Sequence, residues 1–140
     1  MMELEPSIDS LLLADFAEVV NGKLYVMGGG FTAVQLAQFG QPHRFFLAAA
    51  LRIPWTYTNT SIDLGGRLET LDAEPLDCWS LEGQLEAGRA PGQRGGDTVT
   101  MFAAPVEVIV PEPMDVVLRF SFGTDERTAR FRLVEVTPAI

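Results

Sequence analysis

The residues of this chain that could take part in chemistry are few, and their types do not make up a familiar catalytic or metal-binding set. The chain has one histidine, His43, and one cysteine, Cys78. A structural zinc site needs four nitrogen or sulfur ligands, which these two residues cannot supply. A nucleophilic pair of Cys78 and His43 is formally open, but no cationic neighbour or helix start stands beside Cys78 to activate its thiol. The sequence therefore predicts no catalytic, cofactor-binding or metal-binding residue and no cofactor, and Cys78 is interpreted as a small, half-buried apolar residue.

Asp15 is the carboxylate that stands out, because its neighbours from Leu11 to Ala17 are otherwise apolar. If this side chain were buried, its pKa would be raised, as a general acid requires. The interpretation we favour is that it accepts hydrogen bonds from nearby backbone N–H groups and stabilises a turn or bulge. No second titratable residue is placed beside it by spacing, so no acid–base pair follows.

Two further patterns suggest ligand sites without meeting their requirements. A phosphate-binding glycine loop is followed by a helix, whereas Gly28, Gly29 and Gly30 are followed by residues 31–34, which are typical of a strand. Clustered loop carboxylates can hold Ca²⁺, but the spacing here is not that of an EF-hand loop, and an acidic turn in solvent is the favoured interpretation. These carboxylates are Asp72, Glu74 and Asp77.

Trp55 and Tyr57 stand among polar residues, directly after a strongly apolar run. Aromatic side chains in such a position either cover the rim of the core or contact a partner. The core rim is the favoured interpretation, and an interaction surface made of Trp55 and Tyr57 is the alternative. Residues 88–97, which include Arg89 and Arg94, are rich in glycine and predict a mobile loop that could close over an anion.

The elements that must position these residues begin with a hairpin. Asn21 and Gly22 lie between two apolar runs, and a two-residue type I′ turn needs positive φ at both central positions, which Asn and Gly adopt most readily. The register that follows pairs apolar residues, Val19 with Leu24 and Ala17 with Val26. The three glycines at 28–30 then predict a bulge or a sharp bend.

Short apolar or alternating runs recur through the rest of the chain. We expect strands at residues 31–36, 44–53, 61–71, 79–87, 99–103, 106–110, 116–122 and 128–136. Short strands at about ten-residue spacing are typical of a sandwich or barrel. The predicted fold is all-β, a two-sheet antiparallel β-sandwich of 8–9 strands with an N-terminal hairpin. Residues 1–7 are expected to be a short tail and residues 8–140 a single sandwich domain.

Several positions also predict topology. Residues 44–53 are apolar on both faces, which indicates a central strand covered on both sides. Pro105 has no N–H for a ladder and belongs at an edge, a strand end or a bulge, and residues 111–113 are expected to connect the two sheets. Arg130 and Arg132 are expected on the solvated face of an outer strand whose other face carries apolar residues.

The composition of the chain indicates which classes of binding partner to expect. The formal net charge is −9 and 47% of the 140 residues are hydrophobic, which indicates one acidic domain with a substantial core. Duplex-binding surfaces gain affinity from Lys and Arg, so neither nucleic acid nor an anionic membrane surface is expected. A single cysteine and the lack of a basic-then-apolar leader indicate a cytoplasmic protein. Nine arginines against one lysine suggest a bacterial genome rich in GC.

The stretch LLLADFAEVVNGKLYVMGGG, residues 11–30, resembles the opening of a family of uncharacterised bacterial proteins, common in actinobacteria, that forms a domain of unknown function. In that family a Leu-rich strand reaches an Ala-Asp step, then a polar-Gly-Lys-Leu turn and a strand ending in Gly. Weaker similarity covers residues 53–55 and 82–92. The resemblance implies a β-sandwich and assigns no catalytic residue.

The function expected from these observations is a non-enzymatic interaction module that self-associates, as a homodimer, through a sheet face or an edge strand. The alternative is a small-molecule or metal-ion binding protein, or a hydrolase, with its site near Asp15 and the glycines at 28–30. A structural protein of a phage-like or secreted assembly is a third possibility. An apolar pocket with buried carboxylates would favour the alternative, whereas a flat apolar face would favour the interaction module.

Overall fold

The structure, a computed structural model, describes residues 4–71 and 77–136. The described residues contain one short 3-10 helix, η1 (Trp55–Tyr57), and no α-helix. The strands, in chain order, are β1 (Ser7–Val20), β2 (Lys23–Gly29), β3 (Ala33–Leu36), β4 (His43–Ile53), β5 (Ser61–Thr70), β6 (Asp77–Glu86), β7 (Thr98–Val108), β8 (Met114–Phe122) and β9 (Asp125–Glu135).

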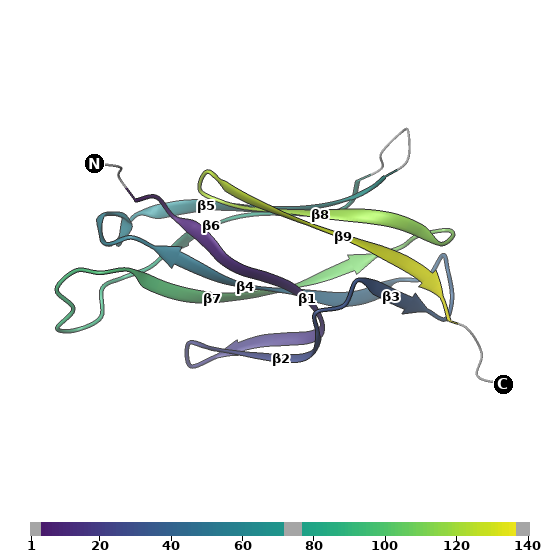
Figure 1. Ribbon diagram of the computed structural model, residues 1–140, viewed down its shortest axis with the longest axis horizontal. Coiled ribbons are helices and arrows are strands. Elements are labelled where there is room, and N and C mark those ends of the chain that lie inside the picture. The colour runs from purple at the N-terminus through teal and green to yellow at the C-terminus, as the bar shows by residue number, and fades with distance from the viewer. Residues whose placement is uncertain (1–3, 72–76, 137–140) are drawn as a thin grey trace.

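These strands form two sheets that pack face to face (Figure 1). The four-stranded sheet has the order β2-β1-β4-β7 and the five-stranded sheet the order β3-β9-β8-β5-β6. The prediction of an all-β, two-sheet sandwich is confirmed, and so is the crossing at residues 111–113, which lead from β7 in one sheet to β8 in the other. Every pairing is antiparallel except that of β3 with β9.

The predicted hairpin and its register are confirmed. Asn21 and Gly22 have φ of 52° and 74°, as a type I′ turn requires. The predicted cross-strand partners, Val19 with Leu24 and Ala17 with Val26, lie opposite each other in β1 and β2. Gly28 and Gly30 also have positive φ, of 64° and 86°, and the chain bends there before it enters β3.

β1 pairs with two different strands along its length. Residues from Ser7 to Ala14 pair with β4, and residues from Ala14 to Val20 pair with β2. Side chains alternate across an undisturbed strand, yet Ala14 and Ala17 both pack with Ala48 in a second apolar cluster, while Leu13 belongs to the main core. The alternation therefore breaks between residues 14 and 17, where β1 bends.

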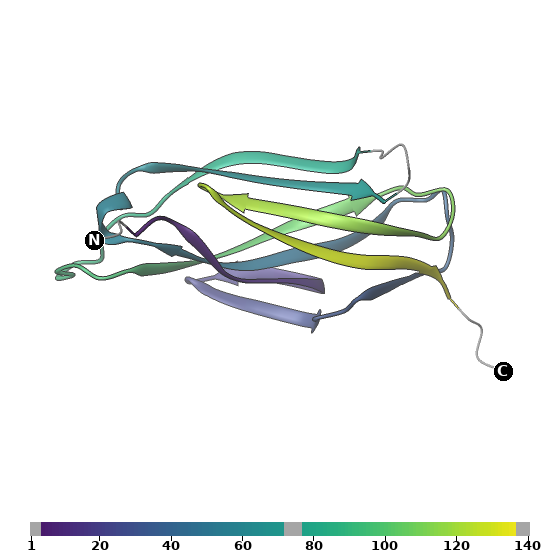
Figure 2. The ribbon, with the colours of Figure 1, turned by 45° about the horizontal axis from the view of Figure 1, so that its top comes forward.

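The bend folds the hairpin back beneath the four-stranded sheet. β2 contacts β7, although β1 and β4 separate the two strands in the order of the sheet. Figures 1 and 2 show the hairpin lying along the outer side of this sheet, away from the five-stranded sheet. β4 is consequently covered on both faces at Ala48, which confirms the prediction of a central strand apolar on both sides.

The main core lies between the two sheets. β4 contributes Phe45, Leu47 and Leu51, and the facing sheet contributes Leu68 and Phe120, all of them almost fully buried. One edge of this core depends on a glycine, because a Cβ at Gly66 would lie 2.9 Å from the Trp79 ring that packs over it. Trp79, whose cross-strand partner is Leu68, thus packs over β5 only because the diagonal position, Gly66, carries no side chain.

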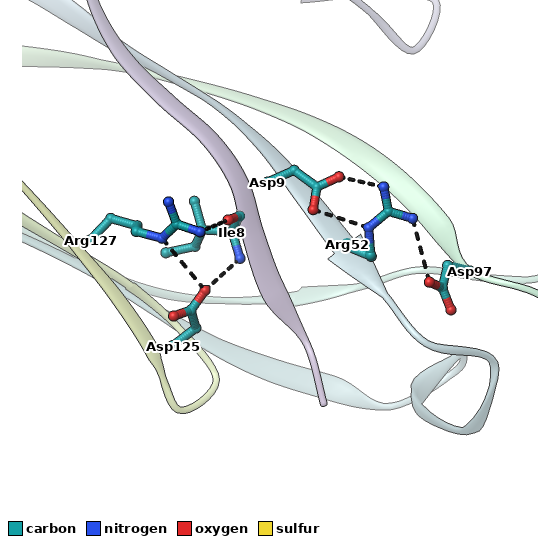
Figure 3. Close-up of polar contacts among 6 residues, drawn as sticks. All are labelled: Ile8, Asp9, Arg52, Asp97, Asp125 and Arg127. Carbon is teal, nitrogen blue, oxygen red and sulfur yellow. Dashed lines mark hydrogen bonds and ion pairs between the residues drawn. The ribbon is translucent and has the colours of Figure 1, made fainter. Parts of the chain in front are cut away.

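The first half of β1 has a backbone edge that no strand pairs, and side chains of β9 satisfy it instead (Figure 3). The Ile8 N–H donates a hydrogen bond of 2.8 Å to Asp125 Oδ2, and Arg127 Nη2 donates one of 2.8 Å to the Ile8 carbonyl oxygen. On the other side of the strand, Arg52 binds both carboxylate oxygens of Asp9 and reaches Asp97 at 3.4 Å. Polar side chains therefore tie the two sheets together at this edge.

Two sequence predictions about the strands were wrong. Residues 99–103 and 106–110 were expected to be separate strands around Pro105, but β7 runs through them unbroken. β7 is an edge strand, and half of the backbone groups of an edge strand face away from the sheet, so a residue without an N–H is tolerated. β9 was expected to be an outer strand, but the parallel pairing with β3 places it inside its sheet. The solvated face of Arg130 and Arg132 is as predicted.

Replacing Gly22 with Val should lower the free energy of unfolding by about 1–2 kcal/mol, because a residue with a Cβ resists the left-handed conformation that this turn needs. Thermal unfolding measures the effect. Gly83→Val is the matched control, since a Cβ at Gly83 in β6 meets nothing within 4 Å and valine suits a strand. Equal melting temperatures for both variants would contradict the turn assignment.

Asp125→Ala should cost about 1–3 kcal/mol, because it leaves the N–H of buried Ile8 without an acceptor. Chemical denaturation should show this loss, and the neighbouring exposed residue provides the control, Glu126→Ala, which should stay close to wild type. If the two variants are equally stable, the edge of β1 does not depend on β9.

Candidate interaction surface

Large apolar side chains are exposed mainly on the hairpin. Those exposed there are Phe16, Val19, Val20, Tyr25, Val26 and Met27. Met27 is 67% exposed and Tyr25 53%. The remaining exposed large apolar residues of the described chain are scattered, namely Leu4, Leu71, Val99, Ile109 and Val136. Scattered apolar residues are normal on a protein surface, whereas a contiguous group marks an interaction site.

One side of the hairpin packs in part against the protein, although Val19 and Val26 on that side are exposed, and the other side is more open. Leu24 and Ala17 pack into the second apolar cluster beneath the sheet. The opposite side, which we call the hairpin face, is made of three cross-strand pairs: Phe16 with Met27, Glu18 with Tyr25, and Val20 with Lys23. Phe16 is held in place by an edge-to-face contact with Phe46, whose ring centroid lies 5.0 Å away. The hairpin face is therefore supported from below by the folded sandwich.

β2 is also an edge strand without the features that usually block pairing. Natural edges are protected by prolines, charges or short length. β7 contains Pro105 and Glu107, β6 carries Glu82 and Glu86, and β3 has four residues. Between Lys23 and its glycines, β2 has no charged residue and no proline, and every β2 residue except Leu24 is exposed. Of the four edge strands in the described part of the chain, β2 is the one that lacks this protection.

The charge of the hairpin face differs from that of the whole chain. The formal net charge of the protein is −9, so two copies repel each other on average. Glu18 and Lys23 are the two charged residues of the hairpin face, and their formal charges cancel. A second copy can approach this face without the repulsion that acts between the rest of the two surfaces.

Trp55 and Tyr57, the residues predicted from sequence as a possible interaction surface, lie in η1 and are half-buried. Tyr57 packs against the main core. The guanidinium of Arg89 lies 3.7 Å from the centre of the Trp55 ring, and its Nε donates a hydrogen bond of 2.7 Å to the hydroxyl of buried Thr58. These contacts fit the core rim, and the role of the two aromatic residues in binding stays a prediction.

Asp15, at the bend of β1, acts on His43 through its charge, a relation that the sequence did not show. Asp15 is exposed, and its carboxylate lies across Gly28, where a Cβ would collide with it. His43 begins β4 and is half-buried, and this burial lowers its pKa below 6.5, while the charge of Asp15 acts in the opposite direction. Because Asp15 is exposed, it lacks the burial that a general acid would need.

The remaining candidates, the acidic loop and the cysteine, fall outside the described side chains. Asp72 and Glu74 lie outside the described residues, and the structure describes Asp77 and Cys78 only as backbone of β6. Among the side chains that are described, no three His, Cys, Asp or Glu residues are placed to hold a metal ion. Nor does the described chain contain a helix of the length and apolarity needed to cross a membrane.

Comparison with known protein families places the whole sandwich in one of them. A model for a family of unknown function, DUF6941, matches residues 9–134, which reach from β1 into the last strand. The chain belongs to the DUF6941 family. The predicted resemblance to a family of unknown function is confirmed, whereas its bacterial origin stays a prediction. No curated protein matches the sequence.

The hairpin face of this DUF6941 chain was missed in the sequence analysis, although a signal was present. Leu24 to Met27 are apolar at four successive positions, so both sides of β2 are apolar. In a two-stranded hairpin only one side can be turned to the core, and the other must be exposed or covered by a partner. The sequence did not show which side was covered, because the bend at Asp15 decides that.

The single histidine of the chain should titrate below pH 6.5, because burial disfavours its charged form. Asp15→Asn should lower this midpoint further by removing a nearby negative charge. The unfolded chain then binds more protons than the native protein between the two pKa values, so stability falls as the pH drops through this window. NMR of the one imidazole ring measures the midpoint directly. A higher midpoint in Asp15→Asn would show that Asp15 does not act on His43.

Proposed function

We propose that this DUF6941 protein is a non-enzymatic interaction module that self-associates as a homodimer through β2 and the hairpin face. The observation that carries the proposal is the coincidence of an unprotected edge strand with the largest group of exposed apolar side chains. Either feature alone is common, but together they supply backbone pairing and apolar burial at one place.

A second copy is the partner that this geometry suits. Two β2 strands related by a twofold axis run antiparallel, which is the relation that pairs their edges and makes each copy bury the same residues. Tyr25 and Met27 of both copies would then lie around the axis, and aromatic residues and methionine are enriched at the centres of interfaces. Glu18 and Lys23 lie on the same face and provide opposite charges for cross-subunit contacts.

The compartment proposed for this module is the cytoplasm. A single cysteine gives the chain no internal disulfide, so the fold depends on its apolar core and polar edge contacts and is compatible with a reducing environment. The proposal for dimer formation does not depend on this location.

Sedimentation velocity over a range of concentrations tests the proposal. Wild-type protein should form a species of twice the chain mass of 15.3 kDa. Met27→Glu places a charge on each side of the twofold axis and should weaken dimerisation at least about tenfold. Ile109→Glu is the control, because Ile109 is 59% exposed but follows β7 and belongs to neither strand of the hairpin.

A wild-type protein that stays monomeric at all concentrations would contradict the proposal. The proposal would also be contradicted if Met27→Glu dimerises as well as wild type and Ile109→Glu does not. The interface would then lie near the end of β7. Thermal unfolding of both variants verifies that they fold, which is expected because both residues are exposed.

A further inference from the structure

The outer face of the five-stranded sheet carries a depression that is separate from the hairpin face. Its volume is about 450 Å³, within the range of small-molecule sites. Its floor lies where Gly65 of β5 and Ser121 of β8 are opposite each other, and these small residues leave a hollow between longer side chains. The floor is polar, because Ser80 of β6 lies beside it and Ser121 Oγ is 3.5 Å from the Gly65 carbonyl oxygen.

Charged side chains of both signs surround this floor. Arg67 and Arg119 lie directly opposite each other on β5 and β8. In the neighbouring row, Glu82 is the partner of Gly65, and Glu126 is the partner of Ser121. All four charged residues line the depression, so two guanidinium groups stand along one side and a carboxylate stands at each flank. The formal charges of this ring cancel.

The arginine pair is held in place by a fifth charged residue. Like charges directly opposite each other on neighbouring strands are unfavourable unless something compensates them. Glu69 does so, because its Oε1 lies 3.3 Å from Arg119 Nε and 3.9 Å from Arg67 Nε, with its side chain only 21% exposed. Glu69 thus positions both guanidinium groups, and on the opposite flank Glu126 Oε1 lies 3.9 Å from Arg119 Nη1. The two arginines and the three glutamates Glu69, Glu82 and Glu126 together carry a formal charge of −1.

The depression continues into a neighbouring hollow of about 550 Å³ that shares Gly65, Glu82 and Ser121 with it. This second hollow extends towards Gln84, whose Nε2 donates a hydrogen bond of 3.0 Å to Asp63. A ligand bound at the charged ring would therefore have room for a substituent along β5 and β6.

We propose that this depression binds a free α-amino acid. Its carboxylate would face Arg67 and Arg119, since guanidinium groups bind carboxylates through paired hydrogen bonds. Its ammonium group would face Glu82 or Glu126, and its side chain would enter the neighbouring hollow. A simple anion is repelled by the two flanking glutamates and a simple cation by the two arginines, so a ligand with both charges close together matches the ring best.

Titration of the isotope-labelled protein with glycine and alanine, followed by amide chemical shifts, tests this proposal. The amides of β5, β6 and β8 around the floor should shift and saturate with a millimolar Kd. Acetate and methylammonium, each carrying one half of the zwitterion, should bind at least about tenfold more weakly. Acetate binding as well as glycine would overturn the proposal in favour of a simple anion site, and no saturable shift with either amino acid would overturn it altogether.

Two variants with matched controls locate the site. Arg119→Gln should weaken glycine binding at least about tenfold, whereas Arg44→Gln, in an exposed ion pair of the other sheet, should not. Gly65→Val fills the floor, because a Cβ there already lies 3.1 Å from Ser121 Oγ. Gly88→Val is its control, because Gly88 lines neither hollow and a Cβ there has only an ordinary contact, 3.7 Å from Asn59 Oδ1. Unchanged binding in both Arg119→Gln and Gly65→Val would overturn the site. Each titration is carried out at a protein concentration at which the oligomeric state has been measured. Amino-acid binding can therefore be interpreted whether or not the protein forms a dimer through β2.

Discussion

The structure depends on how one strand, β1, divides its backbone between two partners. Its first half completes the sandwich beside β4, and its second half forms the hairpin with β2. A straight strand would carry β2 into the plane of the sheet and expose the outer face of β4. The bend between Ala14 and Ala17 instead places the hairpin beneath that face and buries Ala48. It also brings Asp15 near His43 and sets which side of the hairpin is exposed.

Because β1 divides its pairing, two backbone edges of the described chain are left without a neighbouring strand, one on the first half of β1 and one on β2. The two edges differ in what lies beside them. The edge left on the first half of β1 is satisfied within the chain by Asp125 and Arg127, two residues apart on β9. Satisfying a buried N–H matters more than the small net gain of one hydrogen bond, because an unpaired one is costly. Among residues 4–71 and 77–136, no side chain supplies such partners to the edge of β2, and Tyr25 and Met27 lie beside it. This contrast is the physical basis for assigning the contact between copies to β2.

Local sequence signals predicted those features of the fold that depend on a few neighbouring residues. Asn21 and Gly22 specified the turn and its register because both adopt positive φ. Pro105 lies in an edge strand, one of the places predicted for it, but the two strands expected around it are one. Residues 99–110 do not encode whether β7 has a second neighbour, and this decides whether a proline can stand inside the strand. The parallel partnership of β3 and β9 was missed for the same reason, since it joins segments that are far apart in the sequence, such as Ala33 and Arg132.

The sequence by itself determined the all-β class, the hairpin, the solvated face of Arg130 and Arg132, and the small number of histidine and cysteine residues. These follow from alternation, turn chemistry and residue counts, which act over a few positions or over the whole chain. Tertiary structure alone decided the bend of β1, the open edge of β2, the approach of Asp15 to His43, and the ring formed by Arg67, Arg119, Glu82 and Glu126. Each depends on which strands become neighbours, and strand order results from the packing of the whole core rather than from any local stretch.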